Sequence, residues 1–397
     1  MRSIFKVVIY VIFPLILSCF YRYVTYVQSI DPFASFDRAP FNITDISRLI
    51  HSNEAKTQVV LITGASSGLG KSSVKFLAQG FAQGLNDEST SELNIIMACR
   101  NMKKCENVRK EILSEVTPFA QDNMHRFMNT LKLLPMKLDL EKSTSIKMFV
   151  EELETSLETM GDTKVNVLMN NAGVMGISHQ IVEETNTEIQ MHVNHLGHFR
   201  LTSYLIKKQL FHSKHARVVN VSSLAAILPQ FLQLEDINFE HGYLAKIKEY
   251  LPTLASIIYY GASKRANLYF THSLHEKYSI QGIESVAAHP GYSRTSIMFT
   301  GWSWAPQFIK EVMAQNTIAS MHSDDGALMQ LRAALDLDTV KSGDYIVPMW
   351  FTAGRAVNVG KVFGKDSMYI HHFVKSLDWE WKRAEDLWSW SKIKIVQ

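Results

Sequence analysis

A short apolar run followed by a glycine-rich turn constrains the fold of this chain more than any other stretch. Three of the four residues in Val59–Ile62 are β-branched, which predicts a strand buried on both faces. Thr63–Gly70 follows with the spacing Thr-Gly-x-x-x-Gly-x-Gly, and Lys71–Ala78 then has the composition of a helix. Backbone N–H groups and a helix N-terminus would meet there, so the turn favours a bound phosphate group. The alternative is a turn that only connects the strand to the helix.

Size and composition are those of a globular protein with one large domain and appendages, or with two small domains. The chain has 397 residues, of which 46% are hydrophobic and 20% are charged. Its formal net charge of +3, without a basic run, argues against a nucleic-acid partner. The three cysteines, Cys19, Cys99 and Cys105, fit neither a metal site nor a disulfide framework. We therefore expect no metal and a reducing compartment.

Residues 1–30 differ from the rest of the chain and predict a membrane anchor. Val7–Tyr21 carries no charge and is flanked by Lys6 and Arg22. This segment is shorter than the ~20 residues that a helix needs to cross ~30 Å of hydrocarbon, although snorkelling of the two flanking cations would extend it. A cleaved signal peptide and a monotopic hairpin bent at Pro14 are the alternatives.

From Gln58 onward, apolar runs alternate with segments of helical period, which indicates a parallel sheet covered on both faces. We expect seven strands, at Val59–Thr63, Asn94–Ala98, Leu133–Leu138, Val165–Asn170, Arg217–Val221, Glu284–Ala288 and Asp344–Val347. We expect helices at Lys71–Gln83, Lys103–Val116, Ser143–Met160, His192–Phe211, Ala262–Tyr278 and Asp324–Leu337. The pattern predicts a single Rossmann-type, doubly wound α/β domain with a seven-stranded parallel sheet. Its expected range is 58–348, after an anchor (1–30) and a connector (31–57) and before a helical extension (349–397).

Polar or glycine-rich groups follow the strands, at the carboxyl edge where such sheets bind ligands. After the second strand, Arg100 stands where an NAD-binding unit has an acidic residue, and its guanidinium could pair with a 2′-phosphate. Lys71 is a candidate second cation, and a solvated surface arginine is the alternative reading of Arg100. Asp139, after the third strand, would accept a hydrogen bond from adenine or cap the next helix. The pattern favours NADP(H) as the cofactor.

Six motifs, in order and at similar spacing, resemble those of the short-chain dehydrogenase/reductase family. They are Thr63–Gly70, Asn170–Gly173, Val193–Phe199, Val219–Ser223, Tyr260–Lys264 and His289–Thr295. The resemblance covers about Gln58 to Val347. Within the family, three segments look most like the membrane-bound retinol-dehydrogenase group: Ala98–Asn101, Val193–Phe199 and the late Ala384–Ser391.

The role of Tyr260 and Lys264 can be argued from chemistry. Hydride transfer to a carbonyl leaves an oxyanion that needs a proton, and a tyrosine can supply it. Residues four apart share one helix face, so the ammonium of Lys264 would lie beside the phenol of Tyr260. An adjacent cation and the oxidised nicotinamide would both favour phenolate, and a drop of about three units in the pKa of Tyr260 from ~10 would correspond to ~4 kcal/mol. An ordinary exposed Tyr/Lys pair is the alternative.

The resemblance implies roles for the remaining positions. Ser223, the second serine of its pair, would hydrogen-bond the substrate carbonyl. Asn194 would hold a water that links Lys264 to solvent, and Lys264 would also bind the nicotinamide ribose. The residues expected to bind the cofactor are Gly64, Ser66, Ser67, Gly68, Leu69, Gly70, Arg100, Asn101, Asp139, Asn171, Ala172, Gly173, Tyr260, Lys264, Pro290, Gly291 and Thr295. His195 and His198 are expected to pack beside Asn194, because the proposed chemistry needs neither.

One segment departs from the compact family pattern. Thirty-seven positions separate Ser223 from Tyr260, so residues 224–259 are expected to form an insertion that borders the substrate pocket. The resemblance implies a mobile substrate lid at residues 296–320, whose large apolar side chains could instead pack on the core or dip into lipid. The C-terminal extension at 349–397 is rich in tryptophan and predicts an amphipathic helix, which would close over the mouth of the substrate pocket or rest on a bilayer.

The predicted function is that of an NADP(H)-dependent oxidoreductase that interconverts a carbonyl and an alcohol on a lipophilic substrate such as a retinoid, a sterol or a fatty-acyl derivative. We expect it on the endoplasmic reticulum or a lipid droplet, with the catalytic domain facing the cytosol. A lumenal enzyme, glycosylated at Asn42, is one alternative. A catalytically silent NADP(H)-binding membrane scaffold or redox sensor is another. The sequence leaves a homodimer open.

Overall fold

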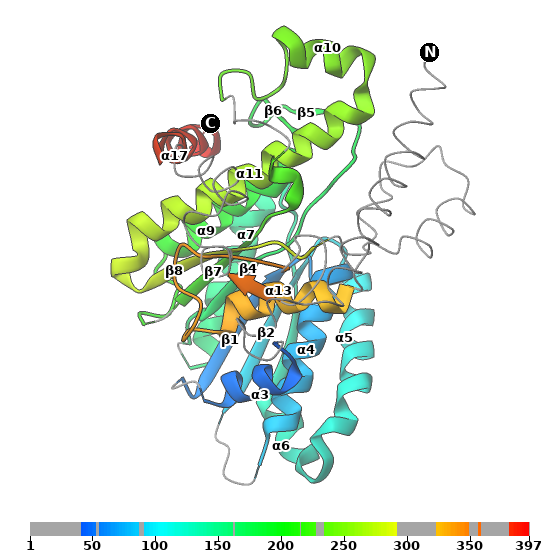
Figure 1. Ribbon diagram of the computed structural model, residues 1–397. Helices are drawn as coiled ribbons and strands as arrows, with labels where there is room; N and C mark the ends of the chain where they lie inside the picture. Colours follow the sequence, from blue (N-terminus) through cyan, green and yellow to red (C-terminus); the bar gives the residue numbers. More distant parts are fainter. Residues whose placement is uncertain are drawn as a thin grey trace, which may run out of the picture.

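A central eight-stranded sheet organises the protein, which is shown as a computed structural model in Figure 1. The structure describes residues 41–52, 55–86, 91–161, 163–214, 216–227, 234–291, 323–348, 356–358 and 381–396. The strand order is β10-β9-β8-β7-β4-β1-β2-β3. The strands are β1 (Thr57–Thr63), β2 (Glu92–Cys99), β3 (Leu131–Lys137), β4 (Val167–Asn170), β7 (Ala216–Val221), β8 (Ile283–Ala288), β9 (Tyr345–Pro348) and β10 (Ala356–Asn358). Seven are parallel, and β10 is antiparallel to β9. The predicted seven-stranded parallel sheet is confirmed, and β10 is an additional strand that the sequence pattern does not predict.

The strand that precedes the glycine turn lies in the middle of the sheet. β1 pairs with β2 on one side and with β4 on the other. Because side chains of a strand alternate between its faces, Val60 and Ile62 enter one hydrophobic core, whereas Val59 and Leu61 enter another. All four are at most 2% exposed. The apolar run is therefore continuous because both faces of the sheet are covered.

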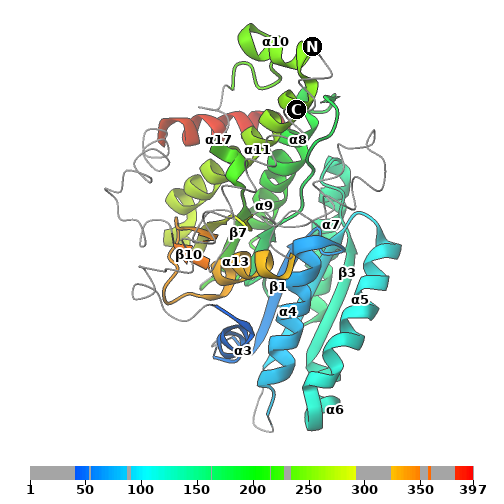
Figure 2. The same ribbon diagram turned by 45° about the vertical axis from the view of Figure 1, so that its right-hand side comes forward.

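Helices cover each face (Figures 1 and 2). One core lies under α3 (Ile43–His51), α4 (Gly68–Gly84), α5 (Met102–Val116), α6 (Met124–Thr130) and α13 (Ser323–Leu335). The opposite core lies under α7 (Ser143–Thr159), α9 (Gly197–Lys207), α11 (Pro252–Tyr278) and α17 (Trp381–Val396). Shorter elements connect them: η2 (Thr117–Asn123), β5 (Ile181–Val182), β6 (Thr187–Glu188), α8 (Ile189–Met191), η3 (His192–Leu196), η4 (Leu224–Ile227), α10 (Gly242–Tyr250) and η5 (Ser279–Gln281).

The end of the expected connector forms α3, which packs on α4. The side chain of Asn42 caps α3 by accepting from the backbone N–H groups of Thr44 and Asp45, and the Asp45 carboxylate accepts from the Asn42 backbone in return. A Cβ at Gly80 of α4 would lie 2.7 Å from the Ile46 side chain, so this glycine permits the close approach of the two helices. The predicted anchor at 1–30 lies outside the described residues. Among those that are described, no helix combines the length and the apolar character needed to cross a bilayer.

The helix that carries Tyr260 begins earlier than the sequence pattern predicts. We expected it to start at Ala262, but α11 starts at Pro252 and continues through the last residues of the insertion. Proline at the first position of a helix is favourable because its missing N–H would have no helical partner there. The rest of the described insertion packs on this extension through a cluster that includes Phe239, Ile247 and Tyr259. The insertion therefore lengthens the helix that carries Tyr260 instead of forming only a loop beside it.

Cys99 and Cys105 are joined by a disulfide, so the expectation of no disulfide is wrong. Cys99 ends β2 and Cys105 lies in the first turns of α5, with their Cα atoms 6.2 Å apart. The chain reverses between them, and this reversal brings together two side chains that spacing alone does not connect. The bond also removes the argument from cysteine usage for a reducing compartment.

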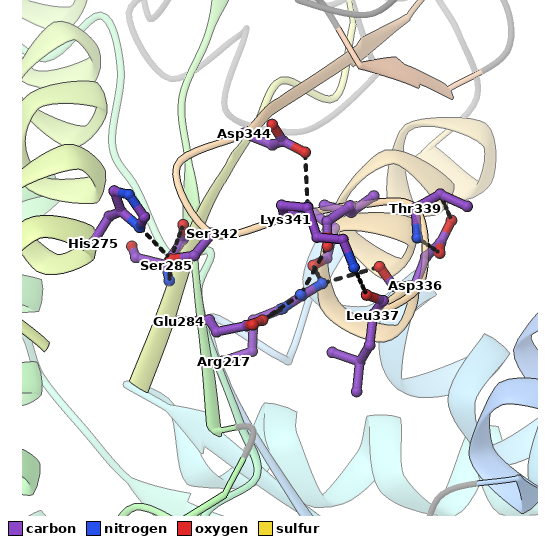
Figure 3. A network of polar contacts seen from close by, with 12 residues as sticks. Arg217, His275, Glu284, Ser285, Asp336, Leu337, Thr339, Lys341, Ser342 and Asp344 are labelled. Atoms are coloured by element: carbon purple, nitrogen blue, oxygen red, sulfur yellow. Dashed lines mark hydrogen bonds and ion pairs between the residues drawn. The ribbon is translucent and has the colours of Figure 1, made fainter. Parts of the chain in front are cut away.

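A buried arginine holds α13 against the sheet at the edge opposite to the glycine turn (Figure 3). Arg217 at the start of β7 is fully buried and pairs with Glu284 at the start of β8. Its guanidinium also donates to three backbone carbonyls, those of Ala333 at 3.1 Å, Asp336 at 3.2 Å and Val340 at 2.9 Å. These carbonyls belong to the last turn of α13 and the loop after it, so Arg217 caps this helix from the sheet.

Candidate active site

The three glycines of the turn are needed either for a positive φ angle or for a close approach of the backbone. Gly64 and Gly68 have positive φ angles, +70° and +50°, which side chains with a Cβ rarely adopt. A Cβ at Gly64 would also lie 3.0 Å from the Cα of Ala172. Gly70 has an ordinary helical backbone, but a Cβ there would lie 2.4 Å from the carbonyl oxygen of Gly64. The glycine spacing thus lets the turn fold tightly and lets α4 begin against it.

The start of α4 has the character of an anion site. Ser67 is its N-cap residue, and within the described part of the chain its side chain makes no capping hydrogen bond. The first turn contains no acidic residue. The N-terminal amides and the positive end of the helix dipole therefore fit a pyrophosphate group. Ser66 and Leu69 lie in the same turn, and the Leu69 carbonyl accepts from the Gln330 side chain of α13 at 3.4 Å.

Thr63 fastens the turn to the end of β4. Its Oγ1 accepts from the backbone N–H groups of Asn171 at 3.0 Å and Ala172 at 2.9 Å. Its carbonyl accepts from Asn171 Nδ2 at 2.7 Å. The turn after β1 and the Asn171–Gly173 segment therefore form one rigid edge of the candidate site.

The end of β2 presents an exposed guanidinium. Arg100 is exposed, and its backbone carbonyl accepts from Lys137 Nζ of β3. The next residue, Asn101, caps α5 by accepting from the Lys104 backbone N–H at 2.9 Å. Lys71, the candidate second cation, pairs with Glu111 of α5 at 2.5 Å. The expected 2′-phosphate contacts therefore centre on Arg100.

Asp139 occupies the turn between β3 and α7. Its Oδ1 accepts from the backbone N–H of Glu141 at 3.2 Å, and its own N–H donates to the Ser145 hydroxyl at 3.0 Å. These local bonds order the turn that leads into α7. The side chain is half-buried beside the end of the strand.

Tyr260 and Lys264 lie one turn apart on α11, which packs against β7, β8 and η4. Their side chains are both buried, with the residues 9% and 2% exposed. Lys264 Nζ lies 5.6 Å from the centroid of the Tyr260 ring and donates to the Val221 carbonyl at the end of β7, 3.0 Å away. The pair is thus held inside the site by the strand that precedes the two serines.

Ser222 and Ser223 face different partners. The Ser222 hydroxyl donates to the Lys264 backbone carbonyl at 2.8 Å, and this serine is 1% exposed. Ser223 acts on the phenol of Tyr260, whose pKa it lowers, and its Oγ accepts from the Ala225 backbone N–H at 3.2 Å. The structure therefore brings Ser223 together with Tyr260 and turns Ser222 into the protein interior.

The pKa of Tyr260 moves in the direction opposite to the expectation. Burial raises the pKa of Tyr260 to about 12, although the hydrogen bond from Ser223 opposes this shift. Burial also lowers the pKa of Lys264 to about 8. In this structure desolvation dominates, and the Lys264 ammonium donates to the Val221 carbonyl instead of to the phenol. The lowering expected from Lys264 and the oxidised nicotinamide together remains a prediction.

Asn194 lies in a π-turn, η3, and joins three parts of the site. In this turn the Gly197 N–H donates to the His192 carbonyl, five residues back, which widens the helix. Asn194 Oδ1 accepts from the Val174 N–H at 2.8 Å, and Nδ2 donates to the Val174 carbonyl at 2.9 Å and to Ser263 Oγ at 3.0 Å.

Gly173 is the point at which Asn194 and Lys264 approach each other. A Cβ on Gly173 would lie 3.3 Å from Asn194 Oδ1 and 3.5 Å from Lys264 Nζ. The structure therefore brings together Asn194, Ser223, Tyr260 and Lys264 around the carboxyl ends of β4 and β7.

Two expected regions are only partly described. Pro290 and Gly291 follow the end of β8, and Gly291 has a positive φ of +73°. Thr295 and the expected lid at 296–320 lie outside the described residues.

Two residues of the site were not singled out from the sequence. Thr63 belongs to the predicted strand and to the glycine-turn motif, and neither pattern assigns a role to its hydroxyl. Ser263 stands inside the Tyr260–Lys264 motif, and its Oγ both accepts from Asn194 and donates to the Tyr260 carbonyl at 2.7 Å. The helical spacing of Tyr260 and Lys264 indicates one face of α11 and does not indicate Ser263.

The fold and the site define a Rossmann-type α/β protein with a Ser–Tyr–Lys cluster at the carboxyl edge of its sheet. A model of the short chain dehydrogenase family matches residues 58–234. Retinol dehydrogenase 11 from Mus musculus is 31% identical over 258 residues, which cover 64% of this chain and 68% of that protein. The chain belongs to the short-chain dehydrogenase family, as the six motifs predict.

Further comparisons agree with this assignment. Retinol dehydrogenase 13 from Homo sapiens is 33% identical over 240 residues, or 60% of this chain and 60% of that protein. The match thus spans about 60% of the length of retinol dehydrogenase 13 from Homo sapiens and of retinol dehydrogenase 12 from Mus musculus. The crystal structure of an uncharacterized protein from Mycobacterium Paratuberculosis aligns with a TM-score of 0.56 and 25% identity, covering 86% of this chain and 94% of that one. Salutaridine reductase from Papaver somniferum shares the fold, with a TM-score of 0.50 and 18% identity over 72% of this chain and 99% of that one.

Proposed function

We propose that this protein is an NADP(H)-dependent oxidoreductase that interconverts a carbonyl and an alcohol on a lipophilic substrate, with Tyr260 as the general acid and base. The observation that carries the proposal is the convergence of three groups: the Ser223 side chain lowers the pKa of the Tyr260 phenol, and the Lys264 ammonium lies 5.6 Å from the centroid of the same ring. These are a positioned proton donor, a second hydroxyl aimed at the same point, and a cation that favours phenolate.

In the reducing direction, the hydroxyls of Ser223 and Tyr260 would both donate to the substrate oxygen. The phenol proton then moves to that oxygen as negative charge develops on it, and Lys264 stabilises the phenolate that remains. Asn194 and Lys264 would return a proton to the phenol through a water molecule. When bound, the cofactor supplies or accepts the hydride, and in its oxidised form it adds a positive ring that favours phenolate. Oxidation of an alcohol is the reverse sequence.

The chain's own residues fit a dinucleotide phosphate. The glycine turn and the uncapped start of α4 suit the pyrophosphate, and the exposed Arg100 suits an adenosine 2′-phosphate. Asp139 and Asn171–Gly173 would line the adenosine and ribose side. Pro290, Gly291 and Thr295 would lie beside the nicotinamide. We take reduction as the cellular direction, because cells generally keep the NADPH pool reduced.

The lipophilic substrate and the membrane location rest on three observations. Val7–Tyr21 is an uncharged run, the described insertion contributes an apolar cluster around Tyr259, and the curated relatives include proteins named retinol dehydrogenases. The site would lie in a domain spanning 58–348, anchored through 1–30 on the cytosolic side of the endoplasmic reticulum or of a lipid droplet. Glycosylation at Asn42 in cells would contradict this orientation.

A substrate panel tests the proposal. The full-length protein in detergent micelles is incubated with NADPH and, separately, all-trans-retinal, a sterol ketone, a long-chain fatty aldehyde and a small soluble aldehyde. NADPH consumption is followed, with the Lys264→Met variant as the control for background oxidation. We expect turnover of at least one lipophilic carbonyl by the wild type and loss of that turnover in the variant. Turnover of the small aldehyde alone, or of none of the four, would contradict the proposal.

A further inference from the structure

His198, which the chemistry above does not use, lies between two parts of the candidate site. It is in the first turn of α9 and is 1% exposed. Its Nδ1 lies 2.9 Å from the backbone carbonyl oxygen of Asn194, and its Nε2 lies 2.9 Å from Thr63 Oγ1. One imidazole ring therefore touches both the π-turn that carries Asn194 and the threonine that fastens the glycine turn to β4.

The chemistry of these partners fixes the direction of both hydrogen bonds. A backbone carbonyl can only accept, so Nδ1 of His198 must carry the proton. Burial lowers the pKa of His198 to about 4, so the ring is neutral and Nε2 must accept. The Thr63 hydroxyl is then the donor to Nε2. It has a second acceptor within range, the Met169 carbonyl at 3.2 Å, but the contact with His198 is shorter.

The same hydroxyl oxygen already accepts from two backbone groups of the cofactor edge. The N–H groups of Asn171 and Ala172 donate to Thr63 Oγ1. The result is a one-way chain of hydrogen bonds from the Asn171–Ala172 backbone through Thr63 and His198 to Asn194. Every polar atom of the imidazole is engaged in it.

We infer that His198 is a positioning residue that couples the nucleotide-binding edge of the sheet to Asn194. The inference rests on the function proposed above. His198 would not contact the substrate, and it would act by fixing the π-turn so that Asn194 keeps its place beside Gly173 and Lys264. Disturbing the chain would then slow the chemical step more than it weakens cofactor binding.

His192, a matched control, lies in the π-turn that also carries Asn194. His192 is also fully buried and has both ring nitrogens engaged, Nδ1 with Thr185 Oγ1 at 2.8 Å and Nε2 with the Glu141 carbonyl at 3.0 Å. Its partners belong to the segment before β6 and to the turn before α7 that also contains Asp139, and neither is part of the chain of hydrogen bonds through Thr63. Replacing His192 removes an equivalent buried imidazole without breaking the chain through Thr63.

The kinetic test compares four variants of the full-length protein. The reduction rate in a single turnover with NADPH and the best carbonyl of the panel is measured per folded protein, and NADPH affinity is measured by fluorescence. We expect His198→Phe to lower the rate about 10- to 100-fold, as for a misplaced catalytic group, with little change in NADPH affinity. His192→Phe should leave the rate nearly unchanged. In His198→Asn the side-chain amide nitrogen can take the place of Nδ1, so this variant should recover most of the rate. In His198→Gln the amide nitrogen takes the place of Nε2, so this variant should not recover the rate.

A measurement without turnover tests the hydrogen-bond chain itself. In ¹⁵N-histidine NMR of the full-length protein, with the His198 signals assigned from the His198→Asn variant, we expect the Nδ1–H tautomer and no titration between pH 5.5 and 9. An Nε2–H tautomer would overturn the inference even if the enzyme is active. Equal losses in His198→Phe and His192→Phe, or equal rates in His198→Asn and His198→Gln, would overturn it as well. If His198→Phe does not fold, the Asn and Gln pair decides. If the wild type turns over no carbonyl, the proposed function fails, and the tautomer still decides whether the chain exists.

Discussion

Burial acts in opposite directions on Tyr260 and Lys264, and this sets the protonation of the site. It raises the pKa of Tyr260 to about 12 and lowers that of Lys264 to about 8. The phenol therefore keeps its proton at neutral pH, which suits donation to a carbonyl oxygen. The Ser223 side chain opposes the effect of burial because it stabilises the phenolate. Ser223 thus brings the pKa of Tyr260 closer to neutral pH.

The proposed preference for NADP(H) depends on Arg100. Removing its guanidinium in Arg100→Ala should lower the affinity for NADPH by about 10- to 100-fold, the loss of a hydrogen bond to a charged group, while NADH affinity stays the same. Lys110→Ala, an equal change of charge at an exposed position further along α5, is the control. Cofactor titrations of the three proteins check this. An unchanged NADPH-to-NADH ratio in Arg100→Ala would contradict the NADP(H) assignment.

Glu188 makes stability depend on pH. This carboxyl at the end of β6 is fully buried, and desolvation raises its pKa from 4.5 to about 7 despite hydrogen bonds from Gln190 and Met191. Between these two values the unfolded chain has lost the proton and the folded protein has kept it, so stability falls as the pH rises. Relative to Glu188→Gln, the free energy of unfolding of the wild type should fall by about 3 kcal/mol between pH 4.5 and 7 and then stay constant.

Urea denaturation at several pH values measures this dependence. Glu183→Gln, in the exposed part of the same hairpin, is the control and should differ from the wild type by a nearly constant amount. A wild-type stability that rises between pH 5 and 7, relative to Glu188→Gln, would be incompatible with a buried neutral carboxyl.

At the scale of elements, Arg217 is expected to hold α13 in place. Its guanidinium pairs with Glu284 and caps three carbonyls at the end of α13. Arg217→Met should lower the free energy of unfolding by about 3–5 kcal/mol, because Glu284 and the carbonyls lose their buried partner. Lys208→Met, which breaks an exposed pair with Glu154 on the opposite layer, should cost less than about 1 kcal/mol. Equal costs in denaturant unfolding would show that Arg217 is not a support of this layer.

The sheet was predictable from the sequence, and several helix ends and cross-links were not. Long apolar runs such as Val59–Ile62 have one stable solution, a strand covered on both faces, so all seven parallel strands were found. β10 was missed because three residues, Ala356–Asn358, carry no period. The start of α11 was missed because Pro252 can end one helix or begin the next, and here it does both for α10 and α11.

The candidate site shows the same division. The spacing of Tyr260 and Lys264 follows from helix geometry, and the resemblance supplied Asn194 and Ser223. The pKa of Tyr260 could not be predicted in the same way, because burial depends on the whole fold and not on one neighbour. The Cys99–Cys105 bond depends on the local reversal between β2 and α5, and the bridge through His198 depends on how distant segments pack.

At the scale of the whole molecule, the two ends of the described chain support opposite layers. α3 packs on the C-terminal part of α4, around Gly80 and Gly84, whereas α17 packs on α11 beside the π-turn. Trp388 of α17 packs edge-on against Phe199 and at a tilt against Phe270, and the Ser391 hydroxyl lies 2.8 Å from Nε2 of His195, the neighbour of Asn194. α17 is therefore part of the support of the candidate site.

The most direct test of the account replaces one of two adjacent tyrosines. Both Tyr259 and Tyr260 are buried on α11, but the Tyr259 hydroxyl donates to the Asn238 carbonyl at 2.6 Å, away from Ser223. With NADPH and a lipophilic carbonyl, the single-turnover reduction rate of Tyr260→Phe should fall at least about 100-fold, the usual contribution of a general acid, while Tyr259→Phe keeps a rate close to that of the wild type. A wild-type rate in Tyr260→Phe would contradict the claim that this phenol supplies the proton.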